Sequence, residues 1–389
     1  MRSLPSRAKR LRIAAVGWLA GLSVILSAAI QSPLMDLPSE ARLAVAPAYE
    51  EDSTPDCPVP DTDRERAPPR GRHLAALGVD RWHAAGYRGR GVKIAILDSG
   101  FRGYRNFLGS ALPDQVTVHS FRYDGNLEAK NSQHGVLCAE VLHELAPEAE
   151  LLLANWEPDA PERFLDAVRW AREQGAHIIS CSVIMPSWSD AEGGGPVHPN
   201  LAHVLGSGDQ AQDVLFFASA GNIARRHWTG PYRDGAGWHE WQPGITDNRL
   251  TSWGRERISV EVCWSTGDGY ALQVIDRFDG KTVARSSDLA KPGRRCAVAR
   301  FIPAPGGSYS IHVGRTQAGG SGAFHLVTLG GELEYSTPWG SVPFPGDGAE
   351  VLTVGAVDVA GQRQPYSSCG ADPRRPKPDL VAPVPFASS

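Results

Sequence analysis

Residues 91–100 read GVKIAILDSG and combine a short apolar run with an acid and a turn. Val92 to Leu97 carries the aliphatic side chains typical of a parallel strand that is buried on both faces. Asp98, followed by Ser99-Gly100, then stands at the C-terminal end of that strand, where α/β sheets build their ligand sites. This stretch therefore predicts both the fold class and the first candidate site residue.

Strands and helices alternate on either side of this stretch. Residues 134–145 and 162–174 repeat apolar side chains with helical spacing, and further apolar runs predict strands. Such alternation indicates an α/β fold, a mostly parallel sheet with helices on both faces. The predicted strands outside 92–97 are 116–121, 149–156, 177–184, 214–219 and 351–357.

Helical spacing disappears between residues 256 and 332. Six segments there are typical of short strands, and several alternate apolar and polar residues, which predicts a β-sandwich inserted into the α/β body. The body is then split into residues 73–255 and 333–389. Cys263 and Cys296 are candidates for a bridge within the insert, although six cysteines allow fifteen full pairings. The six segments are 257–265, 270–278, 281–287, 296–303, 308–315 and 323–330.

The N-terminus carries an export signal. Basic residues precede an uncharged run at 13–30, and small residues at 27–29, near its end, offer a cleavage site, so residues 1–32 are expected to be a secretory signal peptide. The run is also long enough to be an uncleaved membrane anchor. The protein is then secreted or periplasmic, or membrane-anchored with its catalytic domain outside. Residues 33–72 form a Pro-rich linker.

Charge excludes one class of partner. Lys and Arg number 39 against 43 Asp and Glu, and the net charge is −4. A weakly acidic chain has no field that attracts phosphates, so no nucleic acid is expected as a partner.

Three polar residues occupy positions where a parallel sheet builds a site. Asp98 follows a strand, His134 opens a helix, and Asn222 follows the strand 214–219. A serine hydroxyl is a poor nucleophile at neutral pH, so an imidazole must take its proton and a carboxylate must orient that imidazole. A side-chain amide can donate to the oxyanion. The set predicts a serine hydrolase.

Four segments in this order resemble the subtilisin-like serine proteases. They are residues 91–100, His134-Gly135 at a helix start, residues 218–222 (ASAGN), and residues 376–383 (PKPDLVAP). The resemblance covers residues 73–230 and 335–389, and the insert is similar to the β-sandwich insertions of some bacterial members.

The resemblance implies a role for each matched residue. Asp98 would be the triad carboxylate, His134 the general base and acid, and Asn222 the oxyanion donor. Residues Ser182, Val183 and Ile184 would pair with a peptide or protein substrate as an added strand. No cofactor and no metal are required. Family members often bind calcium, but no acidic loop here can be assigned as a site.

The nucleophile of the family is missing from the sequence. The family's serine follows Gly-Thr and opens a buried helix, whereas Ser388 and Ser389 lack both features. We expect a truncated product of a protease gene, inactive as it stands. The alternative is a catalytically inactive binding protein that has kept a protease scaffold. The family's usual Thr or Ser after His-Gly is also replaced, by Val136.

Other kinds of site fit the sequence less well. Gly89 and Gly91 precede the first strand, where a dinucleotide site needs glycines after it. Cys138 lies one helical turn after His134, but no second pair of zinc ligands accompanies them. A tryptophan-rich stretch could stack a ligand or pack in the core, and we expect packing. Its members are Trp228, Trp238, Trp241 and Trp253.

Overall fold

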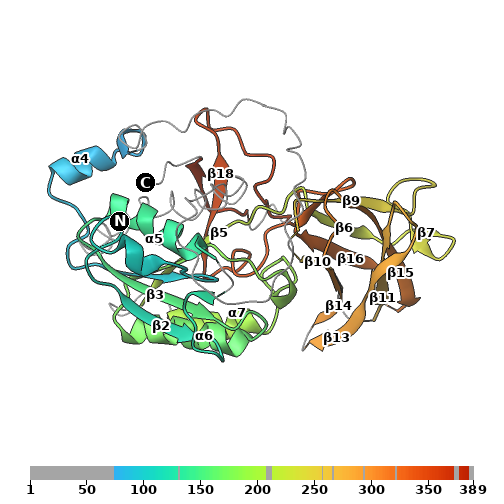
Figure 1. The fold of residues 1–389 in the computed structure, drawn as a ribbon, viewed down its shortest axis with the longest axis horizontal. Coiled ribbons are helices and arrows are strands. Elements are labelled where there is room, and N and C mark those ends of the chain that lie inside the picture. The colour runs from blue at the N-terminus through green and yellow to red at the C-terminus, as the bar shows by residue number, and fades with distance from the viewer. Residues whose placement is uncertain are drawn as a thin grey trace, which may run out of the picture.

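A computed structural model describes residues 74–384, apart from 130–131, 207–212, 256, 265–266, 292–293, 320–321 and 372–375. The predicted signal, the whole predicted linker, Ser388 and Ser389 lie outside the described residues. An α/β part and an all-β part lie side by side (Figure 1). No helix among the described residues is long and apolar enough to cross a membrane.

The α/β part is built on a parallel sheet, which confirms the predicted fold class. Over the described residues the sheet has seven strands in the order β19-β18-β5-β4-β1-β3-β2, and every pairing is parallel. Its central strands are almost fully buried, as expected of a sheet covered on both faces. The strands are β1 (Lys93–Leu97), β2 (Thr117–Phe121), β3 (Glu150–Trp156), β4 (Ile178–Cys181), β5 (Leu215–Ser219), β18 (Leu352–Val357) and β19 (Leu380–Pro383).

Helices cover the two faces of this sheet. α5 (His134–Leu145) packs Val136 and Leu142 on the face that includes Ile94. α6 (Pro161–Glu173) and α7 (Val197–Leu205) pack on the opposite face, with Phe164 and Leu201 in one core. The sequence predicted α5 and α6 but not α7. The remaining helical elements are α4 (Val79–Ala84) and the 3-10 turns η1 (Tyr104–Phe107) and η3 (Pro186–Trp188).

The all-β part is a sandwich. Two antiparallel sheets, each with five strands among the described residues, share one apolar core. One has the order β13-β14-β10-β16-β6 and the other β12-β11-β15-β9-β17. The strands are β6 (His227–Pro231), β9 (Asn248–Ser252), β10 (Ile258–Trp264), β11 (Gly269–Asp276), β12 (Thr282–Arg285), β13 (Ser287–Lys291), β14 (Arg294–Phe301), β15 (Ser308–Gln317), β16 (Ala323–Leu329) and β17 (Gly331–Leu333), beside a ribbon of β7 (Asp234–Gly235) and β8 (Trp238–His239).

The sandwich begins earlier than the expected boundary at residue 256. β6 and β9 both precede that residue and supply one strand to each sheet. The sequence of β6, HWTGP, contains glycine and proline and shows no alternation, which is why it was not predicted as a strand. Cys263 and Cys296 are cross-strand partners in β10 and β14 and form a disulfide.

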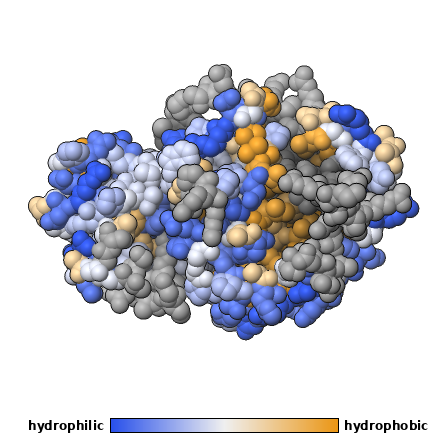
Figure 2. Space-filling model, turned by 180° about the vertical axis from the view of Figure 1, so that it is seen from behind, coloured by the Kyte–Doolittle hydropathy of each residue, from blue (hydrophilic) through white to orange (hydrophobic). Residues whose placement is uncertain are grey.

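The α/β part and the all-β part differ in the hydropathy of their surfaces. Figure 2 shows hydrophobic residues gathered in a band on the α/β part, whereas the all-β part is mostly hydrophilic on that side. Val381 of the edge strand β19 is among the exposed apolar residues. The sandwich core, by contrast, is enclosed between its own two sheets.

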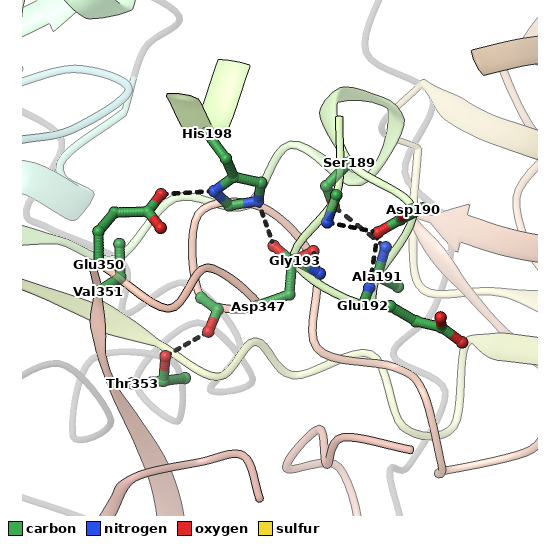
Figure 3. Close-up of polar contacts among 12 residues, drawn as sticks. Ser189, Asp190, Ala191, Glu192, Gly193, His198, Asp347, Glu350, Val351 and Thr353 are labelled. Atoms are coloured by element: carbon green, nitrogen blue, oxygen red, sulfur yellow. Dashed lines mark hydrogen bonds and ion pairs between the residues drawn. The ribbon is translucent and has the colours of Figure 1, made fainter. Parts of the chain in front are cut away.

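A buried histidine connects α7 by hydrogen bonds to the segment that follows the sandwich (Figure 3). His198 Nδ1 lies 2.6 Å from Glu350 Oε1, and its Nε2 lies 3.1 Å from Asp347 Oδ1. Asp347 Oδ2 also accepts a hydrogen bond from the Gly193 amide at 2.9 Å. Burial lowers the pKa of His198, but the hydrogen bonds and charges of the two carboxylates outweigh it and raise the pKa to about 9. The imidazole is therefore protonated at neutral pH and donates from both nitrogens.

Candidate active site

Strand register brings the candidate residues to one edge of the sheet. β4 lies between β1 and β5, with Leu97 opposite Cys181 and Cys181 opposite Ala218. Asp98, which follows Leu97, and Ser182, which follows Cys181, therefore leave the sheet at the same level. Asn222 follows β5 at this edge, as the sequence predicted from strand ends alone.

Asp98 and His134 are in direct contact. Asp98 is fully buried, and His134 Nδ1 lies 2.7 Å from its Oδ2 and 2.8 Å from its Oδ1. The Ser99 amide donates to Asp98 Oδ1 at 2.7 Å, which fixes the carboxylate. Burial lowers the pKa of His134, while the charge and hydrogen bond of Asp98 raise it, and the net pKa is above the ordinary value. The carboxylate thus stabilises the imidazolium form.

The other ring nitrogen of His134 has no hydrogen-bond partner among the described residues. This Nε2 atom is buried, and only 11% of the side chain is exposed. Because Nδ1–H donates to Asp98, Nε2 of the neutral ring carries the lone pair. A hydroxyl group that reaches Nε2 can transfer its proton to it, because Asp98 already orients the ring.

Two glycines allow the turn after β1 to approach the start of α5. A Cβ on Gly135 would lie 2.8 Å from the Gly100 carbonyl oxygen and 2.5 Å from the Phe101 ring. A Cβ on Gly100 would lie 2.3 Å from the Ala129 carbonyl oxygen. The glycines after Asp98-Ser99 and after His134 are therefore needed for the carboxylate and the imidazole to meet.

Gly135→Ala is expected to destabilise the protein by about 1–3 kcal/mol, because the added methyl group overpacks the contact between the β1 turn and α5. Urea denaturation measures the change. Gly254→Ala is the matched control, since a Cβ there meets nothing within 4 Å. Equal stabilities of the two variants would contradict the close-approach argument.

Asn222 lies in a tight turn after β5. Gly221 has φ +88°, and a Cβ on it would lie 3.1 Å from Pro343 Cδ and 3.4 Å from Ile184 Cγ2. The turn that carries Asn222 thus packs against the predicted substrate-binding segment, in which Val183 and Ile184 are partly exposed. Asn222 Oδ1 accepts a hydrogen bond from the Arg226 guanidinium.

Comparison with known proteins relates this geometry to one family. Residues 89–260, a range that contains Asp98, His134 and Asn222, match the model of the subtilase family. This part of the chain is similar to the subtilases. The solved structure of the Clostridium perfringens CspB protease is 14% identical over 80% of this chain and 80% of its own, with a TM-score of 0.51, and this likeness is one of fold.

A second solved structure is the nisin leader peptidase NisP from Lactococcus lactis. It is 15% identical over 78% of this chain and 65% of its own, with a TM-score of 0.36. Curated proteins give no match to the chain. The subtilase scaffold therefore rests on the family match and on the fold shared with the CspB protease.

The candidate site also contains a thiol whose place in it the sequence did not reveal. Cys138 Sγ donates to Asp98 Oδ2 at 3.3 Å and lies 3.8 Å from His134 Nδ1. The Ser182 side chain forms a hydrogen bond with the Cys138 thiol. Burial, followed by the Asp98 charge, raises the pKa of Cys138 well above its ordinary value. In the sequence, only its position one helical turn after His134 indicated that Cys138 lies near the site. The neutral thiol links the end of β4 to the Asp98–His134 pair.

Asp98, His134 and Cys138 also offer three ligand types that zinc accepts. Their ligand atoms all lie within 4.8 Å of one another. A metal would need Cys138 as a thiolate and would replace the Asp98–His134 hydrogen bond. In the structure these side chains are hydrogen-bonded to one another instead, an arrangement that suits proton handling.

Two of the four tryptophans in the tryptophan-rich stretch have a structural role. Trp228 and Trp241 are buried in the sandwich core and contact each other at 5.2 Å between ring centroids. Trp238 lies against His312, at 5.4 Å. Trp253 is 48% exposed, and the Arg226 guanidinium lies 4.4 Å above its ring. Core packing, rather than a stacking platform, thus accounts for two of the four.

Proposed function

We propose that this chain belongs to an exported serine endopeptidase of subtilisin type. In this proposal His134 is the general base and acid, Asp98 its orienting carboxylate, and Asn222 the oxyanion donor. The nucleophile is a serine that is not among the residues described. The single observation that carries the proposal is the Asp98–His134 contact with Nε2 buried and unpartnered among the described residues.

The chemistry follows from that contact. The serine hydroxyl transfers its proton to His134 Nε2 as its oxygen attacks the peptide carbonyl carbon. Asp98 accepts from Nδ1–H, holds the ring in this tautomer, and stabilises the imidazolium that forms. The imidazolium then protonates the leaving amine, and water hydrolyses the acyl-enzyme with the same base. These steps use side chains only, without a cofactor or metal.

Two further features support a peptide substrate. Ser182, Val183 and Ile184 leave β4 beside Asp98, where a substrate backbone could add as a strand. The Asn222 carboxamide would donate to the carbonyl oxygen as charge develops on it. Loss of one such donor typically lowers kcat about 10²- to 10³-fold, which is the magnitude found for the oxyanion donor of subtilisin.

Export and the alternative role complete the proposal. The charge pattern of residues 1–32 supports secretion to the periplasm or exterior, or anchoring through residues 13–30. The Cys263–Cys296 disulfide supports an oxidising compartment. The second candidate function is a binding protein on a protease scaffold, which would hold a peptide along Ser182, Val183 and Ile184 at the end of β4.

A fluorophosphonate probe, which labels activated serines, tests the proposal. The protein encoded by the gene up to its natural stop codon, called the locus product below, is produced in parallel with residues 1–389. The labelled peptide is mapped by mass spectrometry. We expect a labelled serine in the locus product and none in residues 1–389, with heat-denatured protein as the control. No labelling of the locus product, together with saturable peptide binding, would favour the binding protein.

A further inference from the structure

The turn that carries Asn222 leads directly into the sandwich. Asn222 follows β5 of the subtilase sheet, and β6, a strand of the sandwich, begins at His227. Arg226 is the last residue of this connection and is only 5% exposed. A cationic side chain thus lies buried at the junction of the two parts.

The guanidinium of Arg226 holds both oxygens of Asn222. Nη2 donates to the side-chain Oδ1 and, at 2.9 Å, to the backbone carbonyl, which Nε also approaches at 3.3 Å. Burial lowers the pKa of Arg226 to about 10, partly offset by the charge of Glu332. The side chain therefore stays charged at neutral pH, and its hydrogen bonds are charge-assisted.

The sandwich in turn holds Arg226. Its carbonyl accepts the Thr328 amide of β16 at 2.9 Å, and Thr328 is fully buried. The guanidinium lies over the ring of Trp253, which follows β9. Arg226 therefore takes its position from both sheets of the sandwich while its donors point back to Asn222.

The polarity of this contact decides which way the Asn222 amide faces. A guanidinium has only donors, so it selects the carbonyl oxygen of the carboxamide and leaves the NH2 group directed away. An oxyanion needs that NH2 group, because a carbonyl oxygen in its place would repel the developing charge. The backbone of the turn has further partners besides Arg226, since Ser368 Oγ accepts a hydrogen bond from the Ile223 amide at 3.2 Å and the Ser368 amide donates to the Gly221 carbonyl at 3.0 Å.

We propose that Arg226 is a positioning residue that orients the Asn222 carboxamide for the oxyanion, and that the inserted sandwich sets this orientation through Thr328 and Trp253. The inference rests on the proposed function, in which Asn222 is the oxyanion donor. It gives the insert a role in catalysis: the insert determines the geometry of the donor without touching the substrate.

The first test is made on residues 1–389 and needs no activity. Asparagine-selective ¹⁵N labelling gives side-chain NH2 signals, and Asn222→Ala identifies the pair that belongs to Asn222. In Arg226→Met we expect this pair to move to the shifts of a freely rotating amide. Arg225→Met is the matched control, since Arg225 is exposed and pairs with Glu332 instead. An unchanged Asn222 signal in folded Arg226→Met would overturn the proposal.

The second test measures peptide hydrolysis by the locus product. Arg226→Met is expected to lower kcat about 10- to 100-fold with KM within two-fold, a smaller loss than removal of the donor itself. Arg226→Lys, which keeps a charged donor, should recover part of the loss. In an Asn222→Ala background Arg226→Met should have no further effect on kcat, whereas a merely structural role would give additive losses.

The outcomes separate the two proposals. If Asn222→Ala leaves kcat unchanged, the oxyanion role of Asn222 fails. If Asn222→Ala is strongly impaired while Arg226→Met matches Arg225→Met, only the positioning role fails. Should Arg226→Met not fold, Trp253→Leu replaces it, because Trp253 is half exposed and supports the same guanidinium. A Trp253→Leu protein with wild-type kcat and Asn222 signals would then overturn the inference.

Discussion

Asp98→Asn is expected to lower kcat of the locus product about 10⁴-fold, the loss seen when the same exchange is made in a serine-protease triad. The amide can hydrogen-bond to His134 but carries no charge, and it favours the wrong tautomer of the ring. The same variant should change the pKa of His134. With the Asp98 charge removed, burial remains the main effect, so the pKa should fall from above to below its ordinary value.

NMR titration of the histidine rings in residues 1–389 measures this pKa, and His134→Ala identifies the signal. Asp124→Asn is the matched control, because Asp124 forms an exposed ion pair with Arg122 at 2.8 Å and lies outside the site. We expect wild-type kcat and an unchanged His134 pKa in the control. An Asp98→Asn enzyme with wild-type kcat would refute the assignment of the triad carboxylate.

His198→Gln is expected to destabilise the protein by about 3–5 kcal/mol near pH 6, because it leaves the buried Asp347 and the partly buried Glu350 carboxylates without their cation. The wild type should also lose stability with rising pH. The folded pKa of about 9 lies above the ordinary 6.5, so the contribution is complete below pH 6.5 and disappears as the pH rises through 9. At about 1.4 kcal/mol per pKa unit, the loss is on the order of 3 kcal/mol.

Urea denaturation between pH 6 and pH 9.5 measures this dependence. His203→Gln is the matched control, since His203 lies exposed on the same helix. The control should keep both the stability and the pH slope of the wild type, whereas His198→Gln should lose the slope. Parallel pH profiles for wild type and His198→Gln would show that His198 is not the titrating group.

The α/β body could be predicted from the sequence because its signals are local. The strands of a doubly covered parallel sheet are continuous apolar runs, and α5 and α6 repeat apolar residues at helical spacing. α7 was missed because Pro199 and Asn200 interrupt its first turn, although proline is tolerated near a helix start. The start of the sandwich was missed because β6 and β9 lie in a segment rich in turn residues.

The site could be predicted where its residues lie at strand ends or at a helix start. Asp98 and Asn222 follow strands, His134 opens α5, and the structure brings Asp98 and His134 into contact. The contact of His198 with Asp347 depends on how the chain returns from the sandwich to the body, and that of Arg226 with Asn222, four residues apart, depends on the shape of the turn after β5. No periodicity or short motif carries that information.

The placement of the cysteines has a consequence for how the protein matures. Cys263 and Cys296 face each other across paired strands, so correct strand pairing alone brings the two sulfurs together. Cys138, Cys181 and Cys369 are buried thiols in the α/β part. A chain that folds before it meets an oxidant hides these three from exchange, whereas a chain oxidised first exposes them to scrambled pairing. The order of folding and oxidation therefore governs the yield of native protein.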